Sequence, residues 1–113
     1  MARKPPKLKV QFSPRARNSL YEIWEWNAST YDADHADAYI AFLEESTNEL
    51  ATEYLTGNVV SVAPELRYIV IRRRTRGHGH VAIYKIVADT FVNVLNFYHT
   101  SQDWQGKLAR GEW

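Results

Sequence analysis

Four arginines and two histidines gather in one short stretch of the chain. The set is Arg72, Arg73, Arg74, Arg76, His78 and His80. Guanidinium groups make bidentate contacts with phosphate, and the two glycines between the basic residues let a backbone approach an anion closely. The stretch therefore predicts a contact with a nucleic acid or another anionic target. The alternative is a solvated loop that keeps the protein soluble.

His78 and His80 are two residues apart, so on a strand they would share one face and could hold a metal ion. No carboxylate or third histidine stands nearby in the sequence, and zinc sites need three or four protein ligands. We therefore expect no metal site. We also expect no cofactor, because the sequence has no phosphate-binding glycine loop, dinucleotide fingerprint or nucleophile motif.

Tyr98 and His99 could carry acid–base chemistry at the end of a strand. Histidine works as a general acid or base near neutral pH, and tyrosine can orient a reacting group. Together with Arg67 and Arg73, which would stabilise developing charge, these side chains could form a ribonuclease-like catalytic site. The alternative is a histidine that hydrogen-bonds locally, for example to Asp103.

Aromatic side chains are frequent in the first half of the chain, and four of them are candidate anchors for a protein partner. They are Trp24, Trp26, Tyr31 and Tyr39. At helical spacing Trp24 and Trp26 fall on opposite flanks of an apolar stripe, so we expect one of them to be partly exposed. Exposed aromatics anchor partners well because buried aromatics dominate interface energetics. The alternative is that all four belong to the core.

Two helices should position the aromatic groups. Ser13-Pro14 is typical of a helix start, and the apolar stripe behind it continues to Asn27. After a short connection, Asp32 or Asp34 can cap a second helix, which we expect to stop at Gly57-Asn58. Helices joined by so short a link form an antiparallel hairpin.

Strands should position the basic and catalytic candidates. Residues 8–12 alternate apolar and polar, and residues 67–71, 81–87 and 91–97 are rich in β-branched and aromatic side chains, with a turn at 88–90. Residues 103–110 suggest a short C-terminal helix. This order predicts an α+β fold, in which an N-terminal strand and the helical hairpin pack on a twisted antiparallel sheet. The partner of the first strand is left open.

The length and charge distribution of the chain limit the possible domain organisation and surfaces. The 113 residues should form a single domain, 1–113, in which residues 1–7 are a flexible basic N-terminus. Residues 18–66 hold ten carboxylates and no Lys or Arg, while residues 67–85 hold six Lys and Arg and no acid, so we expect two surfaces of opposite charge. The absence of cysteine and of any apolar run of about 20 residues predicts a soluble, cytoplasmic protein without a membrane contact.

An ordered set of short motifs resembles the RelE/ParE superfamily of toxins from bacterial type II toxin–antitoxin modules. The set includes Phe12-Ser13-Pro14-x-Ala16, Leu20-x-x-Ile23-Trp24, Ala38-Tyr39-Ile40, Gly79-His80-Val81-Ala82-Ile83-Tyr84-Lys85-Ile86, and His99 with Asp103-Trp104. The resemblance covers about residues 8–104. The long helical hairpin and the histidine–aspartate ending look more like the ParE branch.

The resemblance implies a plasmid-stabilization type of toxin that a cognate antitoxin neutralises and that inhibits DNA gyrase by binding. Two alternatives stay open. A RelE-like endoribonuclease would cut mRNA on the ribosome with Arg67, Arg73, Tyr98 and His99. The lysine pair of that branch has no clear counterpart in this sequence. A non-toxic nucleic-acid-binding module would use the arginine-rich stretch alone. The oligomeric state is open between a homodimer and a toxin–antitoxin hetero-oligomer.

Overall fold

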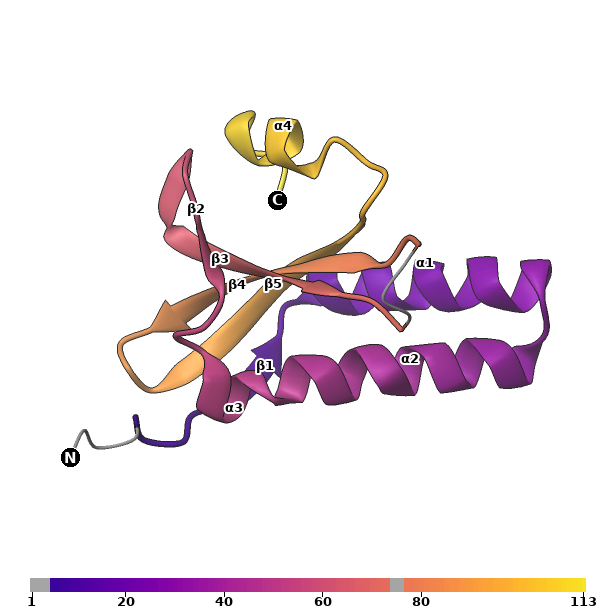
Figure 1. Ribbon diagram of the computed structural model, residues 1–113, viewed down its shortest axis with the longest axis horizontal. Helices are drawn as coiled ribbons and strands as arrows, with labels where there is room; N and C mark the ends of the chain where they lie inside the picture. Colours follow the sequence, from indigo (N-terminus) through magenta and orange to yellow (C-terminus); the bar gives the residue numbers. More distant parts are fainter. Residues whose placement is uncertain (1–4, 74–76) are drawn as a thin grey trace.

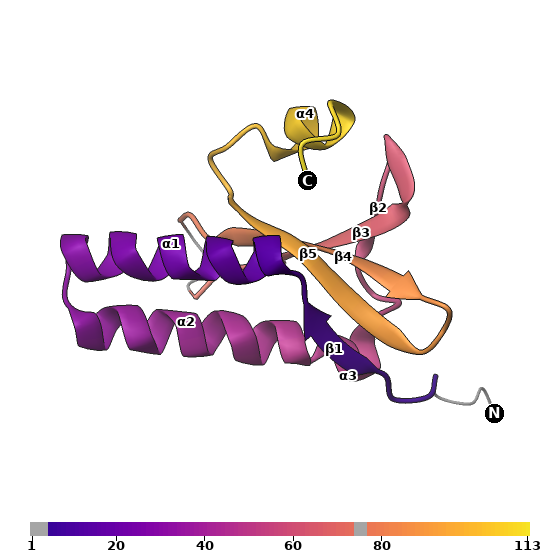
Figure 2. The same cartoon turned by 180° about the vertical axis from the view of Figure 1, so that it is seen from behind.

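The computed structural model describes residues 5–73 and 77–113, so the target-contact candidates Arg74 and Arg76 lie outside the described residues. A long helical hairpin lies on one face of a five-stranded sheet and a short helix lies on the other (Figures 1 and 2). The elements are β1 (Lys9–Phe12), α1 (Pro14–Thr30), α2 (Ala33–Asn48), α3 (Leu50–Glu53), β2 (Asn58–Val60), β3 (Ala63–Ile71), β4 (His80–Val87), β5 (Phe91–His99) and α4 (Trp104–Ala109). This architecture confirms the predicted α+β class.

Side-chain caps set the starts of both hairpin helices. The Ser13 hydroxyl accepts from the Ala16 amide at 3.0 Å and donates to the Leu95 carbonyl at 2.8 Å, so it also ties α1 to β5. Asp32 caps α2 by accepting from the His35 amide at 2.7 Å. The second helix ends earlier than expected, at Asn48, and α3 continues the same buried stripe. The distal half of the hairpin extends beyond the sheet (Figure 1).

The sheet order is β1-β5-β4-β3-β2, and it is mixed where the sequence predicted an antiparallel sheet. The first strand pairs in parallel with the last one, with Lys9 opposite Phe91 and Phe12 opposite Val94. The other pairs are antiparallel. The short edge strand β2 is not part of the expected pattern, because its three residues are too few to show a period.

Each face of the sheet has its own core. On the hairpin side, Leu43 and Leu50 pack against Tyr84, Val92 and their neighbours on the strands. On the opposite side, Leu108 of α4 packs with Leu66, Val81, Ile83 and Tyr98. Because side chains alternate along a strand, the helix-facing residues of β4 and β5 include His80 and His99 at the ends of their strands.

Two residues of the turn between β4 and β5 have a strained backbone conformation that substitution can relieve. Ala88 and Asp89 both have positive φ, 49° and 55°, and the Thr90 amide donates to the Val87 carbonyl at 2.9 Å. This is a type I′ turn, which favours Asn-Gly. Replacing the pair by Ala88→Asn and Asp89→Gly should raise the free energy of unfolding by about 1 kcal/mol in urea titrations. An unchanged or lower denaturation midpoint would contradict this.

Candidate functional site

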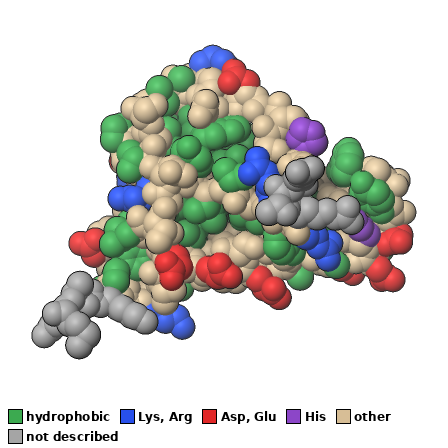
Figure 3. All heavy atoms as spheres, viewed as in Figure 1, with side chains coloured by type: hydrophobic (Ala, Val, Ile, Leu, Met, Phe, Trp, Pro, Cys, Tyr) green, Lys and Arg blue, Asp and Glu red, His purple; other side chains and the backbone are tan. Residues whose placement is uncertain are grey.

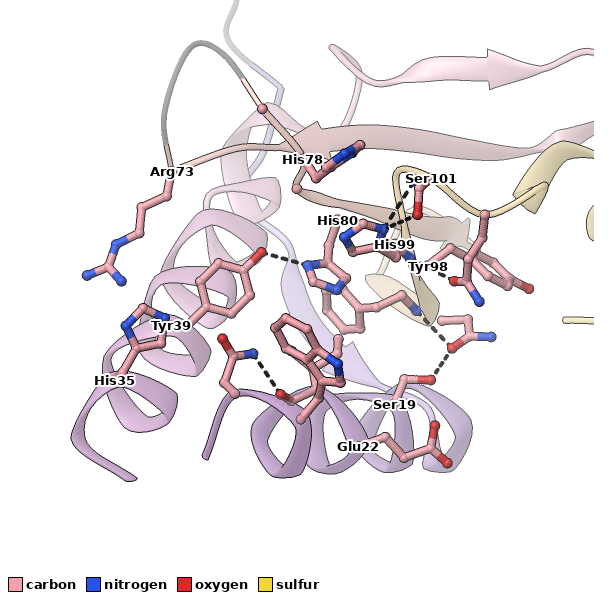
Figure 4. Close-up of a pocket in the computed structure, with 18 of the residues that line it drawn as sticks. Ser19, Glu22, His35, Tyr39, Arg73, His78, His80, Tyr98, His99 and Ser101 are labelled. Atoms are coloured by element: carbon pink, nitrogen blue, oxygen red, sulfur yellow. Dashed lines mark hydrogen bonds between the residues drawn. The ribbon is translucent and has the colours of Figure 1, made fainter. Parts of the chain in front are cut away.

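A pocket of about 1430 Å³ lies between the distal half of the hairpin and the ends of β4 and β5 (Figure 4). One wall comes from α1 and α2, and the other comes from the β3–β4 loop, the strand ends and α4. In Figure 3 acidic side chains form a row along the lower edge of the molecule, where α2 lies. The α1–α2 hairpin carries most of the carboxylates of residues 18–66 and is called the acidic arm below; Glu22 is its one carboxylate among the described residues that line the pocket.

Three histidines meet at the strand ends. The rings of His78 and His80 lie 5.2 and 5.3 Å from the ring of His99, which is therefore the centre of the cluster. The Tyr39 hydroxyl of α2 lies 2.6 Å from Nδ1 of His80, and the Ser101 hydroxyl lies 2.5 Å from Nδ1 of His99. Despite this cluster, the described residues include no set of three side chains arranged to hold a metal ion.

Burial makes His80 and His99 weaker bases than a free histidine. Desolvation, with a smaller contribution from His99, lowers the pKa of His80 from 6.5 to about 4. Burial and the nearby His78 also lower the pKa of His99. Burial raises the pKa of the Tyr39 hydroxyl, against a smaller opposing effect of Arg73. At neutral pH His80 is therefore uncharged, and the Tyr39 hydroxyl can donate to its Nδ1.

The aromatic candidates divide into two kinds. Trp26 and Tyr31 are 61% and 60% exposed, meet edge to face at 6.2 Å, and line the pocket. Tyr39 lines it too, held by His80. Trp24 instead donates from Nε1 to Oδ1 of Asp37 at 2.8 Å and joins the two helices. The prediction that one of the two tryptophans is exposed is confirmed, and that residue is Trp26.

Trp24→Phe tests this division. The substitution removes the hydrogen bond between α1 and α2 while keeping a ring of similar shape, so the free energy of unfolding should fall by about 1 kcal/mol. Trp26→Ala removes a ring that is mostly in water and should change stability by less than about 0.5 kcal/mol. Paired chemical denaturation curves measure both, and a larger loss for Trp26→Ala would reverse the assignment.

The arginine candidates lie in different places. Arg73 lines the pocket and reaches toward the side of α2 that carries Tyr39 and His35 (Figure 4). Arg72 donates from Nε to the Gly77 carbonyl at 3.1 Å. Arg67 lies in the middle of β3, outside the pocket, and its Nη1 donates to the carbonyls of Leu55 and Gly57 at 3.2 and 3.0 Å. Within residues 5–73 and 77–113 the sole ion pair joins Arg110 to Glu112, so neither Arg72 nor Arg73 is tied to the acidic arm there.

The four ribonuclease candidates are not brought to one point. Tyr98 and His99 are neighbours on β5, so their side chains leave opposite faces of the sheet. Tyr98 packs in the core under α4, and its hydroxyl donates to the Glu112 carbonyl at 2.7 Å. Arg73, Tyr98 and His99 all line the pocket, although the Tyr98 hydroxyl is bound on the α4 side, and Arg67 is not among the lining residues.

Several lining residues had not been singled out in the sequence. Ser19 of α1 donates to Oδ1 of Asn96 on β5 at 2.5 Å, and His35 lies 4.3 Å from the Tyr31 ring. Lys107 reaches the pocket from α4. A signal existed for α1, because Ser19, Ile23 and Trp26 recur at helical spacing. No comparable signal links the residues on other elements.

Comparison with known proteins identifies the chain. Among the described residues no helix is long and apolar enough to cross a membrane. No curated protein sequence gives a significant match. A solved structure titled "Chromosomal ParDE TA system from P. aeruginosa" is 14% identical, with a TM-score of 0.68 over 80% of this chain and 94% of that chain, which shows a common fold. Residues 10–104 match the family described as "ParE toxin of type II toxin-antitoxin system, parDE". Because this match runs from β1 to the start of α4, the chain belongs to the ParE toxin family and is the toxin component of a type II toxin–antitoxin module.

Proposed function

We propose that this toxin inhibits DNA gyrase by binding to it, without a catalytic step of its own, and that a cognate antitoxin neutralises it at the aromatic end of the hairpin. The family match supports the gyrase target, because the matched family is that of ParE toxins. Gyrase acts on DNA in the cytoplasm, and the toxin would act there too.

The observation that carries the binding mechanism is the dispersal of the groups that a ribonuclease would need. The Arg67 guanidinium is held by two backbone carbonyls away from the pocket, and the Tyr98 hydroxyl is held by the Glu112 carbonyl. His99 has a lowered pKa, so it is a poor source of a proton for a leaving oxygen at neutral pH. The remaining Arg73 and His99 favour an electrostatic contact over acid–base catalysis.

The exposed aromatics support the proposed antitoxin contact. Trp26 and Tyr31 are exposed side chains of the acidic arm that line the pocket, so a partner segment with basic and aromatic side chains would fit them. Trp26→Ala should weaken antitoxin binding by roughly 30-fold, the effect typical of an interface hot spot, as measured by calorimetry. Trp24→Phe is the matched control and should keep full affinity.

A supercoiling assay tests the gyrase target. Antitoxin-free toxin should inhibit supercoiling when it is about equimolar with gyrase, and the antitoxin should restore activity. Complete supercoiling in the presence of toxin that still arrests growth would refute the proposal. If transcripts were then cleaved during translation, and His99→Ala abolished the cleavage, the ribosome-dependent ribonuclease would replace it.

A further inference from the structure

The chemistry of the pocket goes beyond what a protein anchor requires. Its wall carries aromatic rings, imidazoles, hydroxyls, amides and three charged side chains, and Ile23 is the one aliphatic side chain among the described lining residues. A helical peptide that docks in a groove lays a continuous apolar face against it, and this wall is mixed with polar groups that such a peptide does not use. We propose that the pocket binds a short unpaired segment of DNA, an inference that rests on the proposed action on gyrase and its DNA.

The hairpin wall offers a platform for bases. Trp26 and Tyr31 are both more than half exposed, and the Tyr31 ring packs against the His35 ring at 4.3 Å. Every nucleobase has a flat apolar face, so such rings bind bases with little sequence preference. Removing one stacking ring from a site of this kind lowers affinity by roughly 5- to 150-fold.

The loop after β3 and helix α4 offer contacts to phosphate. Arg73 comes from the loop and reaches toward the side of α2 that carries Tyr39 and His35, and Lys107 comes from α4. The His78 and His99 rings lie 5.2 Å apart at the strand ends. Glu22, on α1, is the one carboxylate among the described lining residues. The sugar–phosphate chain would therefore run between Arg73 and Lys107, with the bases turned toward Trp26 and Tyr31.

The shape of the pocket favours an unpaired strand. Its volume is about 1430 Å³, whereas pockets that bind small molecules reach roughly 1000 Å³. The pocket can therefore hold more than one nucleotide. The bases of a duplex are stacked on one another and could not reach Trp26. An antitoxin anchored on Trp26 and Tyr31 would cover the same recess, so neutralisation would follow from competition.

Fluorescence anisotropy with a labelled oligothymidine of about eight nucleotides tests the inference directly on the antitoxin-free toxin. Trp26→Ala should weaken binding by about tenfold or more. Tyr21→Ala is the matched control, because Tyr21 is 60% exposed on the same helix but does not line the pocket, and it should bind like the wild type. Arg73→Gln should lower the slope of log affinity against log salt by about one. Glu22→Gln should strengthen binding.

Several outcomes would overturn the inference. They are equal binding by the Trp26→Ala and Tyr21→Ala variants, equal affinity for a duplex of the same length, and tighter binding of the matching ribo-oligonucleotide. Supercoiling assays separate the two proposals. Trp26-dependent oligonucleotide binding by a toxin that leaves gyrase active supports this inference and refutes the proposed function. Gyrase inhibition by a toxin that binds no oligonucleotide supports the proposed function and refutes this inference.

Discussion

Gly57→Ala should destabilise the toxin by about 3 kcal/mol, which lowers its melting temperature by roughly 12 °C. A Cβ atom at this position would overlap the Tyr84 hydroxyl and lie 2.8 Å from Cζ of the same ring. Tyr84 is fully buried, and its hydroxyl donates to the Tyr54 carbonyl at 2.7 Å, so the ring has no room to withdraw. Differential scanning calorimetry or urea unfolding measures the effect.

The clash itself can be separated from other effects by a double-mutant cycle. Tyr84→Phe removes the hydroxyl that the new methyl group would overlap, at a cost of about 1 kcal/mol for the lost hydrogen bond. The double variant Gly57→Ala/Tyr84→Phe should then be more stable than the sum of the single losses predicts, by at least about 1 kcal/mol. Strict additivity would show that the added methyl group acts elsewhere, for example on the Arg67 contact with the Gly57 carbonyl.

Acidification should weaken the fold through His80. Its pKa is about 4 in the folded protein against 6.5 for the free side chain, so between these values the unfolded chain binds a proton that the folded chain does not. The stabilisation is complete above about pH 6.5 and is lost as the pH falls toward 4, by up to about 3 kcal/mol. His99, whose pKa is also lowered, shifts stability in the same direction. Urea unfolding at several pH values measures the slope.

His80→Asn isolates the contribution of this one ring. The groups that face His80 are the Tyr39 hydroxyl of α2 and the His99 ring of β5, with Arg73 near Tyr39. Asparagine can offer an oxygen to the Tyr39 hydroxyl but does not titrate, so most of the pH dependence between 6.5 and 4 should disappear. A variant whose stability still falls as steeply as that of the wild type would place the responsible group elsewhere.

The hairpin could be predicted from the sequence because its determinants are local. The buried stripe of α2, including Ala36, Leu43 and Thr47, follows directly from helical spacing, and capping residues mark the helix starts. The parallel pairing of β1 with β5 could not be predicted, because it depends on contacts between residues 82 positions apart, such as Ser13 with Leu95. Edge strand β2 was missed because it has only three residues.

The candidate site was predicted less completely, for a physical reason. Grouping Tyr98 with His99 by sequence ignored the alternation of side chains along a strand, which places the two on opposite faces. Grouping Arg67 with Arg73 by charge ignored the length of β3, which separates them. Trp26, Arg73 and His99 meet in one pocket only through the tertiary packing of the hairpin on the sheet.

The parallel pairing of β1 with β5 also determines when the toxin can fold during its synthesis. Protein synthesis runs from the N-terminus, so β1 leaves the ribosome long before the strand it must join has been made. The nascent hairpin lacks the sheet that buries its apolar stripe until residues 91–99 emerge. The sheet that covers the hairpin can therefore be completed only after most of the chain has been synthesised.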